Sequence, residues 1–269
     1  NMTQGYTFGG ESPSSRVSSV YKVDYANDTS TAGAKGPLSS VGNYCASIGN
    51  SNYGYTGARY NGTPYTNLYS SLDRLDYAND TATATAINAG MTPGGYNYTT
   101  VGNQSYGYFI GGYEPPSYRN NLRRLDYASD TTALAQKGPM RTNTTNGAAA
   151  GNANYGWVNL NFNASSYIDR IDYANDTATP APKGNLSSGN AYDRAATGSS
   201  EYGYFVGGGW PLLSTVDRID YSNDTATSSP KGPINDALTE MQAFSARDYG
   251  FPSTNSPKSV TPAAFGNPV

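Results

Sequence analysis

The acidic and basic side chains that could do chemistry recur at fixed intervals along the chain. A basic residue stands two positions before an aspartate five times: Lys22/Asp24, Arg74/Asp76, Arg124/Asp126, Arg170/Asp172 and Arg218/Asp220. A ring of such charges could bind an anion. Two residues apart on a strand share one face, however, so each pair could equally bridge locally or to a neighbouring unit. We favour the structural interpretation because every copy carries the pair, as scaffold positions do.

A second set of charges lies in the turn that follows each pair. The turn aspartates are Asp28, Asp80, Asp130, Asp176 and Asp224, and four copies carry a later Lys-Gly turn at Lys35, Lys137, Lys183 and Lys231. Several oxygens in one turn could bind Ca²⁺. The fixed glycine and bidentate glutamate of known calcium loops are missing, so we expect these aspartates to cap their turns and predict no metal site. We expect the lysines to be solvated turn residues.

The remaining inventory argues against an enzyme. The chain has no His and one Cys, Cys45, which excludes an imidazole base, a His-based triad, an internal disulfide and a CxxC zinc site. Glycoside cleavage needs two nearby carboxylates in different environments. Glu114 with Asp236 is the one pair worth testing, and nothing in the sequence places them together. We therefore predict no catalytic residues and no cofactor.

Overall charge and hydropathy exclude two classes of partner. The formal net charge is −3, and no basic cluster interrupts the acidic balance, so we predict no nucleic-acid binding. No run of 18 apolar residues exists, so we expect no membrane span. Aliphatic residues are scarce, but 25 Tyr supply large rings that tolerate a wet edge. These features indicate a turn-rich β protein with a thin aromatic core.

An internal repeat must position all of these residues. The string Asp-Tyr-(Ala/Ser)-(Asn/Ser)-Asp-Thr begins at Asp24, Asp76, Asp126, Asp172 and Asp220, at intervals of 46 to 52 residues. A Tyr-Gly marker keeps the same phase at Tyr53, Tyr106, Tyr155, Tyr202 and Tyr249. Two markers in phase over five copies, with a period near 50, are typical of β-propeller blades.

One copy predicts four strands, which we name a to d in chain order. In the last copy they are Ala195–Thr197, Tyr202–Val206, Ser214–Tyr221 and Thr225–Ser229, separated by Gly-, Asn- and Pro-rich turns. Nothing in the copy has a helical period. The sequence therefore predicts an all-β propeller of about five four-stranded blades.

The sequence pattern of the repeat resembles that of kelch-type propeller blades. The resemblance rests on strand b with its double glycine, Tyr108 to Gly112 and Tyr204 to Gly208, followed by a strand ending in Asp-Tyr. It is partial, because copies two and four lack the double glycine and Thr-Ala-Thr replaces the expected tryptophan. The fuller pattern, from Gly203-Tyr204-Phe205 through Asp217–Thr227 to Lys231-Gly232-Pro233, is similar to repeats in tail-fibre and other virion proteins of marine and cyanobacterial bacteriophages. That likeness implies a virion, extracellular setting.

Closure of the ring follows from the order of the strands. The chain starts in strand b, Gly5 to Gly10, and leaves its fifth period through 242–245, the place of strand a. Pairing of these two segments would close a ring without a free edge. We expect a propeller domain at 1–251 and a tail at 252–269. The alternative is a six-blade ring in which 249–269 form part of an extra blade.

Sequence variation is concentrated on one face of the predicted ring. Alternating strand direction places the b–c and d–a loops together there, and we call this the loop face. Its b–c loops carry the candidate ligand-binding residues Tyr60, Tyr65, Tyr113, Tyr118, Phe162 and Trp210. Aromatic rings beside amides and hydroxyls suit stacking on sugars or docking of a protein. The alternative is that the rings fold back over the blade tops.

These features together predict a non-enzymatic appendage of a phage particle, either tail fibre or capsid-associated. Its expected partners are a host cell-surface glycan or receptor and other virion proteins, and a homo-oligomer is possible. Several shallow sites would add avidity without tight binding at any one. Two alternatives stay open: a purely architectural virion or filament subunit, and a secreted carbohydrate-binding propeller lectin.

Overall fold

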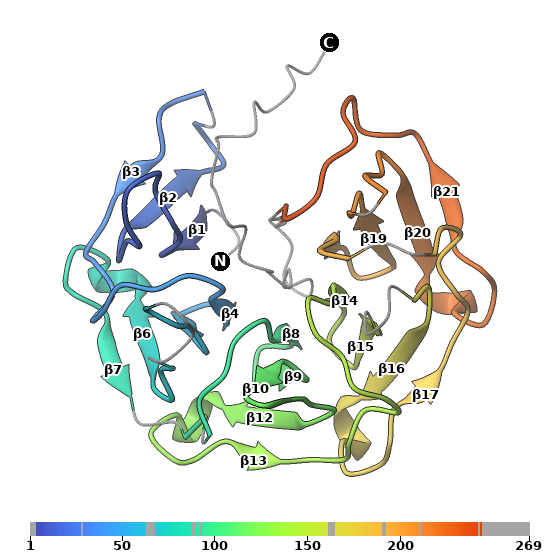
Figure 1. Cartoon of the computed structure of the whole chain (residues 1–269), viewed down its shortest axis with the longest axis horizontal. Coiled ribbons are helices and arrows are strands. Elements are labelled where there is room, and N and C mark those ends of the chain that lie inside the picture. The colour runs from blue at the N-terminus through green and yellow to red at the C-terminus, as the bar shows by residue number, and fades with distance from the viewer. Residues whose placement is uncertain are drawn as a thin grey trace.

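Five antiparallel sheets stand around a central axis in the computed structural model (Figure 1). The structure describes residues 4–27, 29–62, 68–87, 90–91, 93–160, 165–189, 192–209, 211–241 and 243. The protein is an all-β, five-bladed propeller, as the repeat predicts. No helix in this described part is long and apolar enough to cross a membrane.

Each blade follows the chain outward from the axis. Blade 1 contains β1 (Gln4–Phe8), β2 (Val20–Asp24) and β3 (Gly33–Ala34). Blade 2 contains β4 (Ala46–Gly49), β5 (Tyr53–Gly57), β6 (Leu72–Asp76) and β7 (Thr85–Ile87). Blade 3 contains β8 (Thr99–Gly102), β9 (Tyr106–Ile110), β12 (Leu122–Asp126) and β13 (Ala135–Gln136). Blade 4 contains β14 (Ala149–Gly151), β15 (Tyr155–Asn159), β16 (Ile168–Asp172) and β17 (Ala181–Pro182). Blade 5 contains β18 (Ala195–Gly198), β19 (Tyr202–Val206), β20 (Val216–Asp220) and β21 (Ser229–Lys231).

The predicted strands of the last copy are confirmed at b and shifted at d. Strand b spans Tyr202–Val206 as expected, whereas strand d is Ser229–Lys231 instead of Thr225–Ser229. The reason is the 3-10 helix η4 (Tyr221–Asn223), which lengthens the c–d turn. The same helix recurs as η1 (Tyr77–Asn79), η2 (Tyr127–Ser129) and η3 (Tyr173–Asn175). A further hairpin, β10 (Tyr113–Glu114) with β11 (Ser117–Tyr118), was not expected from the sequence.

The Asp-Tyr string explains both the turn and the packing between blades. Its first aspartate caps the 3-10 helix, because the Asp76 carboxylate accepts a hydrogen bond from Ala78 N at 2.9 Å. Its tyrosine stacks on the strand-b ring of the preceding blade: Tyr77 on Tyr6, Tyr127 on Tyr55, Tyr173 on Tyr108 and Tyr221 on Trp157. Each stacked pair adds about 1 kcal/mol beyond its buried area.

The glycine of the Tyr-Gly marker makes room for that tyrosine. A Cβ on Gly107 would lie 2.7 Å from Tyr127 Oη, and Gly107 pairs across the sheet with Gly102. Gly107 therefore leaves space for the tyrosine hydroxyl. Both sequence markers thus belong to one interface.

A three-donor clamp joins consecutive blades through the turn aspartate. Asp80 of blade 2 is bound by three residues of blade 1. It accepts a hydrogen bond from Tyr6 Oη at 2.9 Å and forms ion pairs with Lys22 Nζ at 3.1 Å and Lys35 Nζ at 3.0 Å. Asp176 is bound in the same way by Tyr108, Arg124 and Lys137, and Asp224 by Trp157, Arg170 and Lys183. Asp130 has two such donors, Tyr55 and Arg74.

The clamp refines one expectation and corrects another. The basic residue of the first four pairs, Lys22, Arg74, Arg124 and Arg170, does bridge to a neighbouring blade, but its acceptor is the turn aspartate rather than the aspartate two residues on. The expectation of solvated turn lysines is wrong for Lys35, Lys137 and Lys183, whose side chains are only 17, 14 and 12% exposed. The physical reason is the following glycine, which lets the turn lie directly against the next blade.

The edge between the last and first blades differs from the other four junctions. Blade 1 has three described strands, whereas each of the other four blades has four. The segment expected to supply its strand a lies largely outside the described residues, as do the domain boundary at 251, the tail at 252–269 and the alternative extra blade. Closure by the chain ends therefore stays a prediction.

Candidate ligand-binding face

Five tyrosines form a continuous chain of ring contacts on the loop face of blades 2 and 3. We call Tyr44, Tyr60, Tyr96, Tyr113 and Tyr118 the tyrosine array. Ring centroids lie 5.4 Å apart for Tyr44 and Tyr60, 5.1 Å for Tyr60 and Tyr96, 5.4 Å for Tyr96 and Tyr113, and 4.9 Å for Tyr113 and Tyr118. Loops from two blades therefore build one aromatic surface.

Exposure is graded along the array. Tyr60 and Tyr96 are 5% and 9% exposed, Tyr44 and Tyr113 are half-buried, and Tyr118 is 44% exposed. The Arg16 guanidinium covers Tyr60, 4.7 Å from its ring centroid. Tyr60 thus folds back into the blade top and supports the array, while Tyr118, Tyr113 and Tyr44 keep part of their ring surface exposed.

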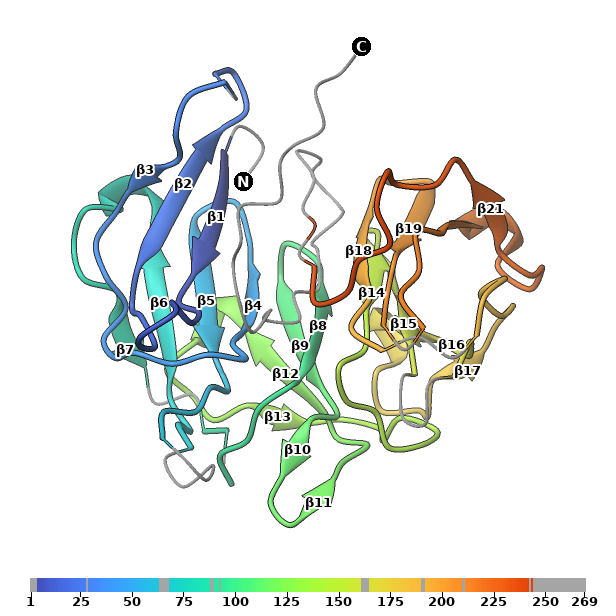
Figure 2. The same cartoon turned by 45° about the horizontal axis from the view of Figure 1, so that its top comes forward.

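A buried glutamate holds the hairpin that presents the outer two rings. Glu114 is 1% exposed, and its carboxylate meets Arg123 Nη1 at 2.6 Å, Arg119 Nε at 3.2 Å and Tyr98 Oη at 2.7 Å. Burial, with the Glu114 charge beside it, raises the pKa of Tyr98 well above its ordinary value. The hairpin β10–β11 projects from the loop face below the other blades in Figure 2. Glu114 therefore fixes Tyr113 and Tyr118 in place.

This network also involves one member of the candidate catalytic pair, Glu114 with Asp236. Two guanidinium groups and a phenol occupy the oxygens of Glu114, whereas Asp236 is exposed beyond β21. Among the described residues, no three Cys, Asp or Glu side chains gather as metal ligands would. The four described turn aspartates, Asp80, Asp130, Asp176 and Asp224, are engaged by the clamp instead.

A polar ring lies beside the array, close to the axis. One non-glycine residue per blade junction has a positive φ of 51° to 59°: Tyr44, Asn97, Asn146, Asp193 and Glu240. The first four precede the inner strands β4, β8, β14 and β18 by two or three residues, and all five side chains are half-buried. Neighbours meet directly, since Asn146 N donates to Asn97 O and Glu240 N donates to Asp193 O. We call these five residues the axial ring.

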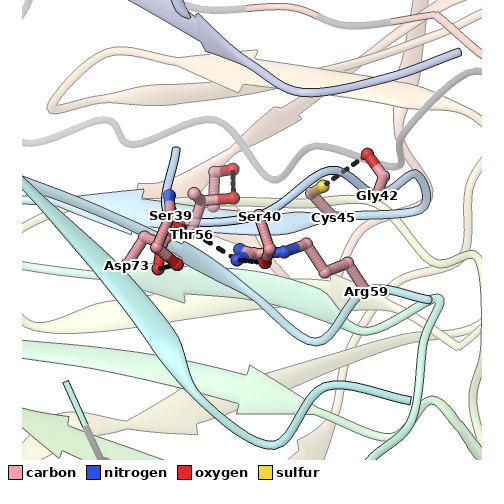
Figure 3. A network of polar contacts seen from close by, with 8 residues as sticks. Ser39, Ser40, Gly42, Cys45, Thr56, Arg59 and Asp73 are labelled. Carbon is pink, nitrogen blue, oxygen red and sulfur yellow. Dashed lines mark hydrogen bonds and ion pairs between the residues drawn. The ribbon is translucent and has the colours of Figure 1, made fainter. Parts of the chain in front are cut away.

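Buried aspartates on the third strands of blades 2, 4 and 5 hold the loops under this face. Figure 3 shows Asp73 of β6 accepting from Ser39 N at 2.8 Å and from Arg59 Nη2 at 3.0 Å. Arg59 and Asp73 are both fully buried in blade 2, and their contacts with Ser39 and Ser40 tie the d–a loop before blade 2 to the core of that blade. Asp169 holds Arg141 in blade 4, and Asp217 holds Ser187 and Ser188 in blade 5. Cys45 is buried in the same region, and burial raises its pKa to about 11, so its thiol stays protonated at neutral pH.

The structure brings together three of the six predicted binding residues. Tyr60, Tyr113 and Tyr118 belong to the array, whereas Tyr65, Phe162 and Trp210 lie outside the described residues. The sequence argument missed Tyr44 and Tyr96 because it counted aromatic residues only in the b–c loops. Both lie in d–a loops of the same face, so a search of those loops would have found them.

The comparisons with known proteins support the fold. No protein-family model and no curated protein matches the chain. Among solved structures, that of YjhT matches with a TM-score of 0.67 and 11% sequence identity, covering 88% of this chain and 86% of that one. An identity of this size shows the fold alone. The propeller fold predicted from the repeat is thereby supported.

Proposed function

We propose that this chain is a non-enzymatic binding propeller of a phage virion appendage, and that its loop face attaches to glycans on the host surface. The tyrosine array carries the proposal. Aromatic rings stack on the apolar faces of sugars, while the amides and carboxylates of the axial ring are suited to sugar hydroxyls. The virion setting rests on the likeness of the repeat to tail-fibre sequences.

The rigidity of the face supports this function. Ordering flexible side chains on binding costs about 0.5–1.5 kcal/mol for each one. The tyrosines pack on one another, and the Glu114 network holds their hairpin, so much of that cost is met during folding. A preformed shallow surface suits weak binding that becomes strong through multiple copies.

Replacement of the outermost ring tests the proposal. Tyr118→Ala removes a ring that is 44% exposed, and we expect it to weaken binding to host-cell glycans at least fivefold without a change in thermal stability. Binding of purified protein to a glycan array and to host cells measures the effect. Tyr21→Ala is the matched control, because Tyr21 is 43% exposed on β2, away from the array. Equal binding by both variants would contradict the proposal.

An architectural role is the second candidate, and one observation favours it. Leu212 and Leu238 are 51% and 38% exposed on the loop face of blade 5, where Leu238 forms a β-bridge to Leu213. Exposed aliphatic side chains fit a protein partner better than a sugar. Leu212→Ser should then reduce incorporation into particles and leave glycan binding unchanged.

A further inference from the structure

A second exposed tyrosine lies on the loop face of blade 4, outside the tyrosine array. Tyr167 directly precedes β16 and is 49% exposed, more than any other tyrosine in the described part of the chain. Its backbone is held in place, because Leu160 N donates to Tyr167 O at 2.9 Å. A single exposed ring is ordinary on a protein surface, so the case for a site depends on the groups around it.

An anchored guanidinium lies over the Tyr167 ring. Arg141, in the d–a loop before blade 4, places Cζ 5.3 Å from the ring centroid. The fully buried Asp169 accepts from Arg141 Nε at 3.1 Å and from Arg141 Nη2 at 2.8 Å. This two-nitrogen contact fixes the guanidinium, and the guanidinium supports the ring through a cation–π contact. Tyr167 therefore presents a ring surface that is ordered before any ligand binds.

Blade 3 presents the same combination of groups. Tyr118 is 44% exposed, and the next residue, Arg119, has a side chain that is 38% exposed and lies 3.2 Å from the buried Glu114 carboxylate. The side chain of Arg141 is 40% exposed. Each of the two blades thus offers an exposed ring and a partly exposed arginine whose charge is paired with a buried carboxylate.

The d–a loop before blade 4 connects the two positions. Thr144 N donates to Arg119 O at 3.0 Å, and Thr144 O accepts from Gly112 N at 2.8 Å, so this loop lies against the base of the hairpin β10–β11. Arg141 precedes Thr144 by three residues, so their Cα atoms are at most about 11 Å apart. The hairpin of blade 3 and the Tyr167 ring therefore flank one short segment on the same face.

We propose that Tyr167 and Arg141 form a second sugar subsite, and that the ligand of the loop face is an extended polysaccharide chain that contacts blades 3 and 4 together. The inference rests on the proposed glycan-binding function and specifies the form of the ligand. Tyr118 stacks on one sugar ring of the chain and Tyr167 on another. Asp169 binds Nε and Nη2 of Arg141, which leaves Nη1 to donate to a sugar hydroxyl. A single terminal sugar fills only one of the two subsites, whereas a chain gains avidity by filling both.

The dependence of affinity on chain length distinguishes two subsites from one. The probes are host-cell surface polysaccharide and its fragments, separated by size down to single sugars, and titration calorimetry gives a Kd for each. We expect the longest fragments to bind the parent protein about fivefold more tightly than the shortest, because a second ring stacks. Tyr167→Ala should abolish most of this gain and weaken binding of the shortest fragments far less. Equal affinity of the parent protein for long and short fragments would overturn the proposal.

Two further variants show whether the Tyr167 ring itself is responsible. Tyr167→Phe keeps the ring and removes only the hydroxyl, so it should bind long fragments as the parent does. Tyr21→Ala removes a ring of similar exposure, 43%, from β2 and controls for the loss of a surface tyrosine. The proposal is wrong if Tyr167→Phe loses as much affinity as Tyr167→Ala.

Comparison with Tyr118→Ala separates failure of this inference from failure of the proposed function. If Tyr118→Ala weakens binding while Tyr167→Ala binds long fragments as Tyr21→Ala does, the second subsite is refuted and glycan binding stands. If all three alanine variants bind as the parent does, glycan binding by this face is refuted and the subsite with it.

Discussion

At the scale of single residues, the protein uses similar side-chain chemistry from different sequence positions. Blade 2 pairs Asp73 on strand c with Arg59 from the end of strand b. Blade 3 reverses the pattern, with Arg123 at the strand-c position and Glu114 supplied by the b–c hairpin. A buried charge is costly without its partner, so a blade that buries one member of such a pair needs the other close by. The position of either member is free to change.

The turn aspartate Asp80 belongs to the same scale and makes stability depend on pH. Burial alone would raise the pKa of Asp80, but hydrogen bonds from Lys35, Lys22 and Tyr6 outweigh it and hold this pKa below its ordinary value. A carboxyl with a lowered folded-state pKa stabilises the fold above its unfolded-state pKa, which is about 3.9. That contribution is lost as the pH falls through the folded-state value.

Asp80→Asn should therefore weaken the fall in the free energy of unfolding as the pH is lowered. At pH 7 we expect a loss of roughly 3 kcal/mol in the free energy of unfolding, because two lysines lose their partner. Between pH 5 and pH 2 the gap between variant and parent should shrink. Denaturant unfolding measured across this range tests the prediction, with the exposed Asp236→Asn as the control. A gap that is independent of pH would count against it.

At the scale of elements, the Lys-Gly turn joins one blade to the next. Gly36 N, Gly138 N and Gly184 N each donate to the backbone carbonyl of the next blade's turn aspartate at 2.9 Å. Such an approach leaves no space for a side chain. The loss of lysine from the second copy also explains why Asp130 has only two clamp donors.

Gly184→Ala should destabilise the propeller by about 2 kcal/mol. The added Cβ lies 1.8 Å from the Ala226 carbonyl oxygen, and a backbone atom cannot move aside as a flexible side chain can. Gly33→Ala should change the free energy of unfolding by less than about 0.5 kcal/mol. Thermal unfolding of the two variants compares them directly, and similar midpoints would show that the blades adjust to the clash.

At the scale of the whole molecule, the axial ring predicts how the chain end pairs with β1. In blade 2, Ser47 follows the positive-φ residue Tyr44 by three positions and faces Thr56, with 2.9 Å between their hydroxyls. Glu240 is the corresponding residue at the end of the chain, and Thr7 follows Tyr6 as Thr56 follows Tyr55. By this correspondence, Ala243 is expected opposite Thr7.

A double cysteine variant tests this register. In a Cys45→Ser background, Thr7→Cys with Ala243→Cys should form a disulfide within one chain and raise the thermal midpoint. Phe8→Cys with Ala243→Cys is the control, because neighbouring strand residues point to opposite faces. Thiol counting and a non-reducing gel measure the outcome. Free thiols in the first variant, or links only between chains, would argue against closure by the two termini.

The sequence by itself determined the repeat, the blade count, the limits of strand b and the capped Asp-Tyr turn. These features depend on contacts within about ten residues or on a period that repeats five times, and both are visible in a linear string. The propeller follows, because a module this poor in aliphatic residues must share its interior with neighbours.

Only the tertiary structure decided which charges and rings meet. Arg124 reaches Asp176, and Tyr60 reaches Tyr96, across blade boundaries that no spacing within one repeat defines. The sequence also does not show that blade 3 places the basic residue, Arg123, on strand c and the acidic residue, Glu114, in the hairpin. Either arrangement of the two charges gives a buried ion pair. The rotation from one blade to the next sets these contacts, and that rotation depends on packing of the whole interface.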